Sequence, residues 1–553
     1  MSNEHNGESD VTPTESQIIR TAGNFPHGNR EIPETSVASM AAERSEKAKN
    51  QSSDMHVSGK SDSFVVPKKR ANKTGLPTVA ESVEGRRLTK ENARQSLLDR
   101  TQSRNRVGRP TQPRSRGLSG VRAAARKDGK EKFTNLLHHL TPELLRASFF
   151  DLKKRAAAGV DGQTWQDYSA GFERRIDDLH GRIHRGAYRA KPSKRTYIPK
   201  GDGKMRPLGI ASLEDKIVQQ ATRTVLECIY EQDFLGFSYG FRPGRGPHQA
   251  LDALSVGIMT RNVNWIIDAD IRGFFDNISH EWLMKFLKHR ISDPWMLRLL
   301  KKWLRAGVSE DGQWSPTTVG TPQGAVISPL LANVFLHYVL DLWIVAWRKR
   351  AAGEVIIVRY ADDFVIGFRE ESDARRCLAD LKERFTKFGL ELHPDKTRLI
   401  EFGRFAQQRR SRRGEGAPET FDFLGFTHTC SKTRKGAFTI HRKTARKKFQ
   451  AKLADIQAKL SASLHAHVEQ VGTWLRSVVR GWYQYYAVPG NYLRLRQFHD
   501  AIREQWLRVL RRRSQRGHRL TWDKFAKICQ TWLPTPKILH PYPNVRFACQ
   551  HPR

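Results

Sequence analysis

The sequence is poor in cysteine, short of acidic residues and without a long uninterrupted hydrophobic segment. Its five cysteines are scattered over 553 residues, which excludes a disulfide framework and a paired-cysteine zinc site. The most apolar window, 326–347, contains four residues that are costly in hydrocarbon, Pro329, Asn333, His337 and Asp341. We therefore expect a buried helix there and no membrane partner. The N-terminus lacks the apolar segment of a secretory signal, which favours a reduced, cytoplasmic environment.

The shortage of acidic residues leaves a large positive charge. Lys and Arg number 96 against 57 Asp and Glu, for a formal net charge of +39. Such a surplus needs a polyanionic partner. Nucleic acid is the first candidate, because Lys and Arg that neutralise phosphates release counterions and bind without regard to sequence. An acidic membrane surface is the weaker alternative.

The N-terminal quarter of the chain differs in composition from the rest. Residues 1–60 hold 6 basic and 9 acidic residues among Ser, Thr, Asn, Gly and Pro, without periodicity. Residues 61–130 hold 18 basic and 6 acidic residues, which fits either a solvated linker or an arm that touches RNA. Apolar residues recur at helical spacing from Phe133 onward. We predict a disordered N-terminal extension over 1–130.

The middle of the chain, about 190–430, alternates strands with helices, which predicts an α+β fold. Two β-branched runs, 354–360 and 364–368, are separated by Ala-Asp-Asp and indicate a hairpin with an acidic tip. We expect a further strand at 265–271 and helices at 217–230 and 330–347.

Beyond residue 440 the pattern is helical and is broken at Pro489-Gly490. Residues 441–520 hold 18 basic and 4 acidic residues. Aromatic residues lie between the basic ones, which is typical of a surface that binds nucleic acid, although packing is the commoner role for such rings. The aromatic residues are Trp474, Trp482, Tyr483, Tyr485, Tyr486, Tyr492 and Trp506.

Three aspartates at strand ends form the sharpest candidate site. Asp270 ends one expected strand, and Asp362 with Asp363 occupy the hairpin tip. An acidic pair at a turn is common by itself. Carboxylates gathered at the ends of buried strands, however, are unfavourable unless a cation neutralises them. Two Mg²⁺ ions roughly 3.5–4 Å apart would do so and would activate a 3′-hydroxyl.

Other residues along the chain would suit a nucleotide. Phe275 could press on a sugar, or could simply be core. Gln323 lies in the loop Gly320-Thr-Pro-Gln-Gly324, which read alone is only a turn. Lys200 and Arg206 flank a Gly-rich turn and could clamp a triphosphate.

These segments together resemble the reverse transcriptases encoded by group II introns, from about Phe133 to about Leu520. The resemblance is carried by blocks in a fixed order. They are Lys194-Arg-Thr-Tyr-Ile-Pro-Lys200 with Met205-Arg-Pro-Leu-Gly-Ile210, Ser238-Tyr-Gly-Phe-Arg242-Pro-Gly-Arg245, Asp268-Ala-Asp270-Ile-Arg-Gly-Phe-Phe275-Asp276, Gly320-Thr-Pro-Gln-Gly324 with Ile327-Ser-Pro-Leu-Leu-Ala-Asn333, Tyr360-Ala-Asp-Asp363, His393-Pro-Asp-Lys396-Thr397 and Phe423-Leu-Gly-Phe426. The segment Ala158-Gly-Val-Asp-Gly162 and the run Gly481-Trp-Tyr-Gln-Tyr-Tyr486 are similar to an N-terminal block and to a maturase domain of the same family.

The resemblance implies a right-hand polymerase fold with fingers and palm, followed by an α-helical thumb or maturase domain. It implies that Asp270, Asp362 and Asp363 are catalytic and that they hold two Mg²⁺ ions together with Ile271. It implies a nucleotide site formed by Lys200, Arg206, Phe275, Gln323 and Lys396. The RNA-binding residues that we expect from it are Arg242, Arg245, Arg480, Trp482, Tyr485, Arg494, Arg511 and Arg512.

The same resemblance implies the protein's partners and its division into domains. The protein would bind its group II intron RNA, assist splicing, and copy that RNA into DNA from a target-site primer with dNTPs. It would act in the bacterial cytoplasm, associated with nucleoid or ribonucleoprotein. The oligomeric state is not fixed by the sequence. After the extension, the expected domains are 131–265 (N-terminal block and fingers), 266–436 (palm), 437–520 (thumb or maturase) and 521–553 (a short segment, expected to be a DNA-binding remnant).

The C-terminus of this chain differs from that of many members of the family, and other functions compete with the one that the resemblance implies. Only about thirty residues follow Leu520, so we expect no endonuclease domain and a primer made by another agent. The rival interpretations are an RNA-dependent RNA polymerase, a retron or defence-type reverse transcriptase, and an RNA-binding splicing chaperone with an idle polymerase site. Phe275 opposes ribonucleotide use, because its ring would clash with a 2′-hydroxyl.

Overall fold

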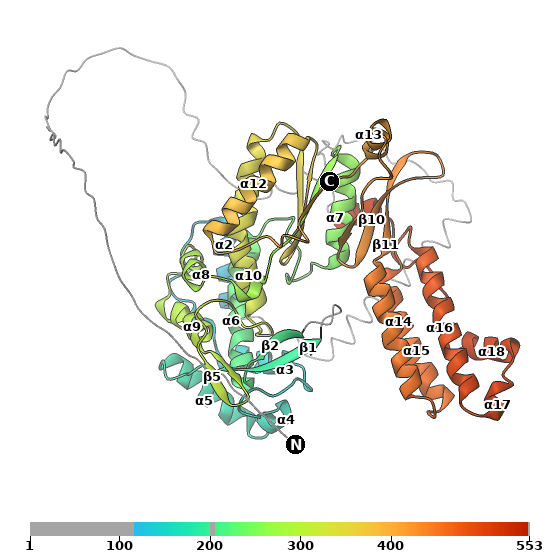
Figure 1. The fold of residues 1–553 in the computed structure, drawn as a ribbon. Helices are drawn as coiled ribbons and strands as arrows, with labels where there is room; N and C mark the ends of the chain where they lie inside the picture. The colour runs from blue at the N-terminus through green and yellow to red at the C-terminus, as the bar shows by residue number, and fades with distance from the viewer. Residues whose placement is uncertain (1–115, 200–204, 551–553) are drawn as a thin grey trace, which may run out of the picture. The chain divides into compact units, whose positions relative to one another are not determined.

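The computed structural model describes residues 116–199 and 205–550. Lys200 and residues 1–115 of the predicted N-terminal extension lie outside the described residues. The described chain mixes helices with three small sheets, as the predicted α+β class requires (Figure 1).

The described structure begins with a helix that the sequence did not indicate. Helix α2 (Arg116–Lys127) buries Leu118, Val121 and Ala125 and packs against α6 (Leu213–Asp233). The prediction of disorder over 1–130 is therefore wrong for the part that α2 spans. The apolar face of α2 consists of only these three residues and is surrounded by basic ones. The composition of the segment therefore did not indicate a helix.

A group of helices follows, and the first long one, α3, packs against α6. Helix α3 starts with a Thr141 side chain that accepts a hydrogen bond from the Leu144 amide (3.3 Å) and with Pro142 at its first position. The predicted helix at 217–230 is confirmed within α6. The other helices before and beside the sheets are η2 (Leu137–His139), α3 (Pro142–Asp151), α4 (Trp165–Ser169), α5 (Phe172–His184), α8 (His280–Leu287) and α9 (Pro294–Arg305).

The first sheet has the strand order β2-β1-β4-β5. Strands β1 and β2 form an antiparallel pair, and the short strand β4 joins β1 in parallel. The strands are β1 (Ser193–Pro199), β2 (Met205–Ile210), β4 (Val308–Glu310) and β5 (Gln313–Ser315).

The central sheet has the order β6-β7-β3-β8, and its hairpin is the predicted one. Residues alternate between two cores. Ile267 and Ala269 face the core that includes α12, whereas Ile266 and Val365 face the core that includes α7. The elements are β3 (Trp265–Asp270), β6 (Val355–Tyr360), β7 (Asp363–Phe368), β8 (Arg398–Glu401), α7 (Pro247–Thr260), η3 (Phe274–Asp276) and α12 (Glu371–Lys387).

The most apolar segment is the expected buried helix. It is built from α10 (Ser328–Leu336), the π-helical η4 (His337–Asp341), α11 (Leu342–Trp347) and η5 (Arg348–Arg350). By length and composition Ser328–Arg350 could span a membrane, but 72% of its most apolar window is buried inside the protein. Its polar residues Asn333 and Asp341 are buried as well.

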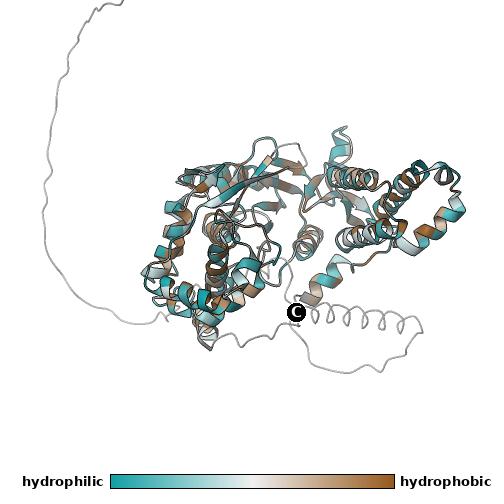
Figure 2. Ribbon diagram, turned by 90° about the horizontal axis from the view of Figure 1, so that it is seen from below, coloured by the Kyte–Doolittle hydropathy of each residue, from teal (hydrophilic) through white to brown (hydrophobic). Residues whose placement is uncertain are grey.

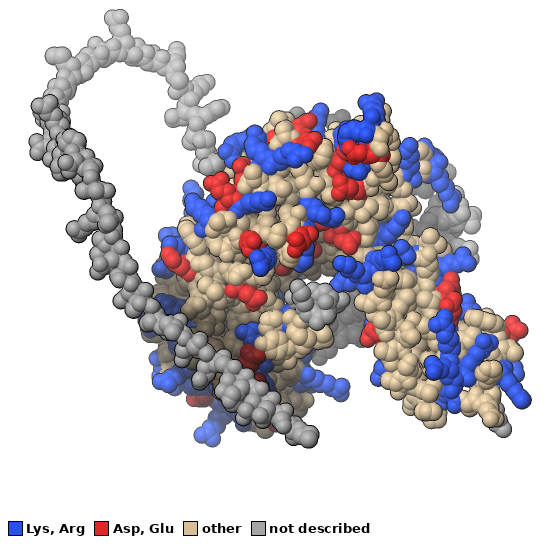
Figure 3. Space-filling model, in the orientation of Figure 1, with Lys and Arg blue, Asp and Glu red and all other residues tan. Residues whose placement is uncertain are grey.

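The C-terminal part contains the third sheet, in the order β11-β10-β9, and a set of helices of which α15, α16 and α18 are amphipathic (Figure 2). The predicted break at Pro489-Gly490 lies between α15 and α16. Lys and Arg outnumber acidic residues on the visible face of these helices (Figure 3). The elements are α13 (Ala406–Arg412), β9 (Phe421–Phe423), β10 (Phe426–Lys432), β11 (Phe438–Thr444), α14 (Arg446–Ala462), α15 (Val468–Tyr486), α16 (Tyr492–Arg512), α17 (Gln515–His518), α18 (Trp522–Trp532) and α19 (Pro543–Gln550).

The last segment folds back onto the rest of the chain. Helix α19 packs against α7, and the Arg546 guanidinium pairs with the fully buried Asp252 of that helix. Asp252 also pairs with Arg442 of β11 at 2.9 Å. Upstream, the Leu539 amide donates to the Ala487 carbonyl (2.9 Å). The tail thus joins α7 to the end of α15.

Candidate active site

The register of the central sheet brings the predicted aspartates together. Asp270 at the end of β3 lies directly opposite Asp363 at the start of β7. Directly paired residues share a face, and Asp268 lies two residues before Asp270 on that same face. This face is the one toward α7, because Ile266 and Val365 belong to that core.

The hairpin tip holds Asp362 in a strained, closely packed turn. Ala361 has φ +59°, a conformation that costs a non-glycine residue about 1 kcal/mol or more. Gly240 lies against the tip so closely that any side chain there would clash with the Ala361 backbone. Asp362 therefore follows a backbone whose path is fixed by its neighbours.

A buried polar network holds this tip from behind. Arg359, with no exposed surface, donates to both carboxylate oxygens of Asp341 at 2.7 and 2.6 Å. The same guanidinium donates to the Asn333 side-chain oxygen (3.0 Å) and to the Ala361 carbonyl (2.9 Å). Asn333 in turn donates to the Gly240 carbonyl at 2.8 Å. Three distant segments thus converge on the turn that carries Asp362.

Two of the carboxylates on the face have basic partners. Lys396 Nζ lies 2.7 Å from Asp270 Oδ2. Arg398 Nη2 lies 3.3 Å from Asp268 Oδ2. Both pairs are partly exposed, so neither adds much to stability. Their effect is local, because each cation neutralises one carboxylate of the cluster.

Three of the carboxyl groups at this sheet end have raised pKa values. Burial, and then the charges of Asp268, Asp362 and Asp270, raise the pKa of Asp363 to about 8. Burial, and then the charge of Asp270, raises the pKa of Asp362 as well. Burial raises the pKa of Asp268 to about 6, against the opposing effect of Arg398. Without a cation, burial and mutual repulsion therefore disfavour the charged forms of these carboxyl groups at this sheet end.

The donors present fit a hard divalent cation. Asp270, Asp362 and Asp363 offer only carboxylate oxygens, which suit Mg²⁺, and a cation would relieve the repulsion that, after burial, raises the pKa values of Asp362 and Asp363. Two backbone hydrogen bonds flank Ile271, one accepted by the Asp270 carbonyl and one donated by the Arg272 amide. Neither of them uses the Ile271 carbonyl. Within 116–199 and 205–550, no group of three or more His, Cys, Asp or Glu side chains is already arranged around a metal position.

The Gly320–Gly324 loop joins two segments. The Thr321 amide donates to the Phe275 carbonyl (2.8 Å), and the Gly209 amide of β2 donates to the Gln323 carbonyl (2.6 Å). Gln323 also donates from its side chain to Asp276 at 3.3 Å. The half-buried Phe275 packs against the core that includes α12.

Of the two other basic residues that we expect at the nucleotide, the structure describes Arg206 but not Lys200. Arg206 of β2 is exposed, and its charge lowers the pKa of Asp362, against the dominant effect of burial. It is therefore close enough to the aspartates to act on them. Lys200 lies outside the described residues.

The turn Leu424-Gly425 approaches the aspartates from the third sheet. A hydrogen bond from the Leu424 backbone lowers the pKa of Asp363, against the larger effect of burial. The Tyr485 hydroxyl donates to the Leu424 carbonyl at 2.8 Å. Helix α15 thus holds the turn that touches the catalytic candidates.

The structure corrects one of the predicted RNA contacts outright. Arg242 is 6% exposed, pairs with Glu231 at 3.0 Å, and donates to the carbonyls of Leu235 and Ser238. The Arg242 guanidinium forms its ion pair and hydrogen bonds inside the protein, so the prediction that Arg242 binds RNA is wrong. A basic residue in a chain of this charge is easily mistaken for a phosphate contact.

Four other predicted RNA contacts also have internal partners. Arg245 donates to the Gly236 carbonyl, and Arg511 to the Leu520 carbonyl. Trp482 stacks on Phe498 with ring centroids 4.6 Å apart, and Tyr485 stacks on Phe426. These two rings pack, which is the commoner role weighed for them above.

The other three predicted RNA contacts lie on the C-terminal helices with more of their surface available. Arg480 and Arg512 are exposed, and Arg494 is half-buried over the Phe449 ring. RNA binding stays a prediction for these three.

Sequence reasoning missed the network of Arg359, Asp341 and Asn333, and it gave Asp268 no role. A signal was present. Asn333 and Asp341 interrupt the most apolar segment of the chain, and buried polar residues in such a segment need partners. The identity of those partners depends on contacts between residues far apart in the sequence.

The fold and this cluster of carboxylates fit a nucleic acid polymerase, and comparison with known proteins specifies its class. A family model described as reverse transcriptase (RNA-dependent DNA polymerase) matches residues 198–428. The chain is 35% identical to protein YkfC of Escherichia coli (strain K12) over 337 residues, which is 53% of this chain and 87% of YkfC.

Relatives named for introns complete the comparison. Group II intron-encoded protein LtrA of Lactococcus lactis is 39% identical over 210 residues, 37% of this chain and 35% of LtrA. Nuclear intron maturase 4 of Arabidopsis thaliana is 26% identical over 227 residues, 40% of this chain and 27% of that protein. The chain thus spans about a third or less of these two relatives. It belongs to the group II intron reverse transcriptase/maturase family and is an RNA-directed DNA polymerase.

Proposed function

We propose that the protein copies group II intron RNA into DNA by a two-Mg²⁺ mechanism, from a primer at the DNA target site. The observation that carries this proposal is the convergence of Asp270, Asp362 and Asp363 at one end of the central sheet. These carboxylates, with the Ile271 carbonyl, would hold the ions. When bound, the ions would activate the primer 3′-hydroxyl and neutralise charge on the transferred phosphate.

The chain's own residues would orient the reactants. Lys396 now pairs with Asp270 at 2.7 Å. Once Asp270 binds a cation, the Lys396 ammonium would be released from this pair and could bind the departing phosphates. Arg206 of β2 and Lys200, which follows β1 in the sequence, would bind the triphosphate of the dNTP. Phe275 and Gln323 would contact its sugar, since the Gly320–Gly324 loop is hydrogen-bonded to the Phe275 carbonyl and to Gly209 of β2.

These roles assign the palm, fingers and thumb of a right-hand polymerase to segments of the chain. The central sheet serves as the palm (266–436) and the β1–β2 sheet with the helices before it as the fingers (131–265). Helices α14–α16 serve as the thumb or maturase domain (437–520), with 521–553 as a further segment. Their basic surface, including Arg480, Arg494 and Arg512, supports binding to intron RNA and assistance in splicing. A reaction on nucleic acid of this kind suits the bacterial cytoplasm and its nucleoid.

The proposal is tested by primer extension with purified protein, Mg²⁺ and dNTPs on an RNA template. We expect cDNA from the wild type and none from Asp362→Ala/Asp363→Ala. Splicing of the intron should persist with this variant, because the basic helices lie on other elements. A folded variant that still makes cDNA would refute the assignment of the site. A variant that loses splicing and cDNA equally would refute the separation of the two functions.

A further inference from the structure

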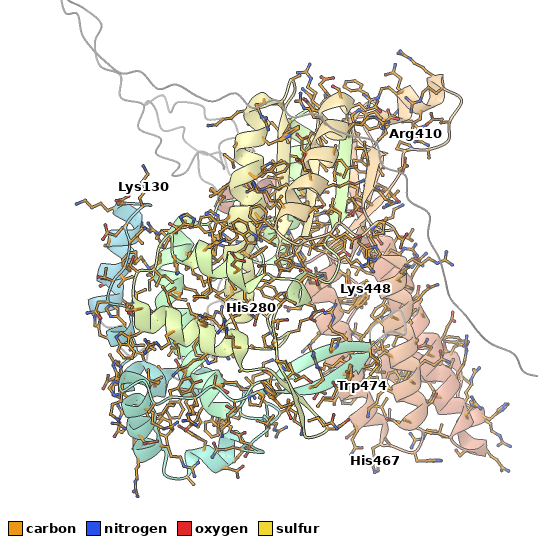
Figure 4. All side chains as sticks on the ribbon, turned by 60° about the vertical axis from the view of Figure 1, so that its left-hand side comes forward. Lys130, His280, Arg410, Lys448, His467 and Trp474 are labelled. Atoms are coloured by element: carbon orange, nitrogen blue, oxygen red, sulfur yellow. The ribbon has the colours of Figure 1, made fainter. Side chains whose placement is uncertain are left out.

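A groove with a basic lining lies outside the site described above. It has a volume of about 720 Å³ and is bordered by α8, α9 and the chain segment around β5. Figure 4 labels His280, which lines the groove at the start of α8. The lining residues that matter here are Lys285, Lys288, Lys301, Arg305, Trp314 and Thr317.

The positive charge of the groove is largely uncompensated. Its one acidic lining residue, Glu281, is paired with Lys285 at 2.6 Å. Lys288, Lys301 and Arg305 are exposed and form no ion pair with the described residues. Three free cations along one groove provide a site for successive phosphates.

An aromatic ring is fixed at the edge of this groove. Trp314 is 59% exposed, although its Nε1 donates to the Ala306 carbonyl at 3.1 Å. The ring lies so close over Gly307 that a side chain there would clash with it. A large aromatic ring held rigidly with an open face is a stacking platform for a base.

The groove adjoins the copying site through backbone contacts. His280 forms a hydrogen bond with the Gly320 carbonyl at 2.6 Å, and the lining segment 316–318 continues directly into the Gly320–Gly324 loop. Gln323 of that loop belongs to the proposed nucleotide site. A strand in the groove would therefore pass next to the place where RNA is copied.

We propose that this groove binds single-stranded RNA, with a base stacked on Trp314 and the phosphates on Lys301, Arg305 and Lys288. A single strand is favoured over a duplex because only an unpaired base can offer its face to the ring. The inference rests on the proposed function for the origin of the strand, which is either the template ahead of the copied position or another unpaired part of the intron.

The test combines mapping and affinity. A 12-nucleotide RNA containing 4-thiouridine is photocrosslinked to the full chain, and mass spectrometry locates the adduct. Binding of the same RNA and of an RNA duplex of equal length is then measured for Trp314→Ala and Lys301→Glu/Arg305→Glu. Because the chain is strongly basic, the matched control is Lys382→Glu/Lys387→Glu, which makes the same charge change on exposed positions of α12.

We expect an adduct on the peptide that contains Trp314 and about tenfold weaker single-strand binding by Trp314→Ala. Lys301→Glu/Arg305→Glu should weaken it more than the control does, and should reduce the salt slope by about 1.4. Duplex binding should change little in Trp314→Ala. No adduct on that peptide, wild-type affinity of Trp314→Ala, or an equal loss for duplex would each overturn the proposal.

Primer–template complexes with and without a template overhang then identify the source of the strand. If only the overhang complex is weakened, the strand is the template. If neither is weakened while free single strands are, it is another part of the intron. Extension by one nucleotide, measured at a saturating concentration of primer–template, should stay at the wild-type level in every groove variant. Loss of extension by the wild type would refute the proposed function and leave the binding result standing.

Discussion

The buried network behind the hairpin tip provides the sharpest mutational test. In Arg359→Lys the charge opposite Asp341 is kept, but one ammonium cannot replace a guanidinium that makes four hydrogen bonds to Asp341, Asn333 and Ala361. Losing the bonds to Asn333 and Ala361 should cost about 3 kcal/mol of unfolding free energy, at roughly 1.5 kcal/mol each for a charged donor.

A catalytic effect is expected beyond this loss of stability. The Ala361 carbonyl precedes Asp362, so release of the turn should displace a proposed metal ligand. A misplacement of about 1 Å can cost a hundredfold in rate. We expect kcat for single dNTP addition to fall between tenfold and a hundredfold, and the Mg²⁺ concentration for half-maximal activity to rise.

The control is a second buried Arg–Asp pair that is remote from the turn. Arg290 is 2% exposed, lies 3.1 Å from Asp233, and donates to two backbone carbonyls near α2. Arg290→Lys should lower the melting temperature similarly and leave kcat and the Mg²⁺ requirement unchanged. Equal catalytic losses in Arg290→Lys and Arg359→Lys, or none in Arg359→Lys, would refute the role of the network in positioning Asp362.

Three further predictions follow from the described contacts. The raised pKa of Asp363 means that, without metal, stability is lost as pH rises through about 8; Asp363→Asn should therefore lose less melting temperature than the wild type between pH 6 and 9, and parallel curves would contradict this. Phe275→Ala should incorporate ribonucleotides that the wild type rejects, as measured by primer extension with NTPs; unchanged selectivity would show that the ring is only core. Arg546→Gln removes one of two cations from the buried Asp252 and should cost about 2 kcal/mol in denaturant unfolding; wild-type stability would mean that the tail does not brace α7.

The sequence was sufficient for the elements with strong local signals. The β-branched runs around Asp270 and Asp363 identified the hairpin and its neighbouring strand, and the register then confirmed that the two aspartates face each other. The helical pattern also located α6, and Pro489-Gly490 located the break between α15 and α16. These features depend on residues close in the chain, which is why a single sequence is enough to find them.

Features that depend on distant contacts were missed or misassigned. Arg242 looked like a phosphate ligand, because nothing local indicates that Glu231 and two carbonyls enclose it. Arg359 sits one residue before the acidic motif, yet its partners lie on α10 and η4. Helix α2 was missed because its short apolar face is stabilised by packing on α6, a contact that the local sequence does not reveal.

The central claim is that Asp270, Asp362 and Asp363 jointly hold the divalent ions of a polymerase. Anomalous scattering from Mn²⁺ in crystals grown with a primer–template and a non-reactive dNTP analogue would test it most directly. We predict two peaks between the carboxylates of Asp270 and Asp362, beside the Ile271 carbonyl. Peaks elsewhere, or no peak at this sheet end with the nucleotide bound, would contradict it.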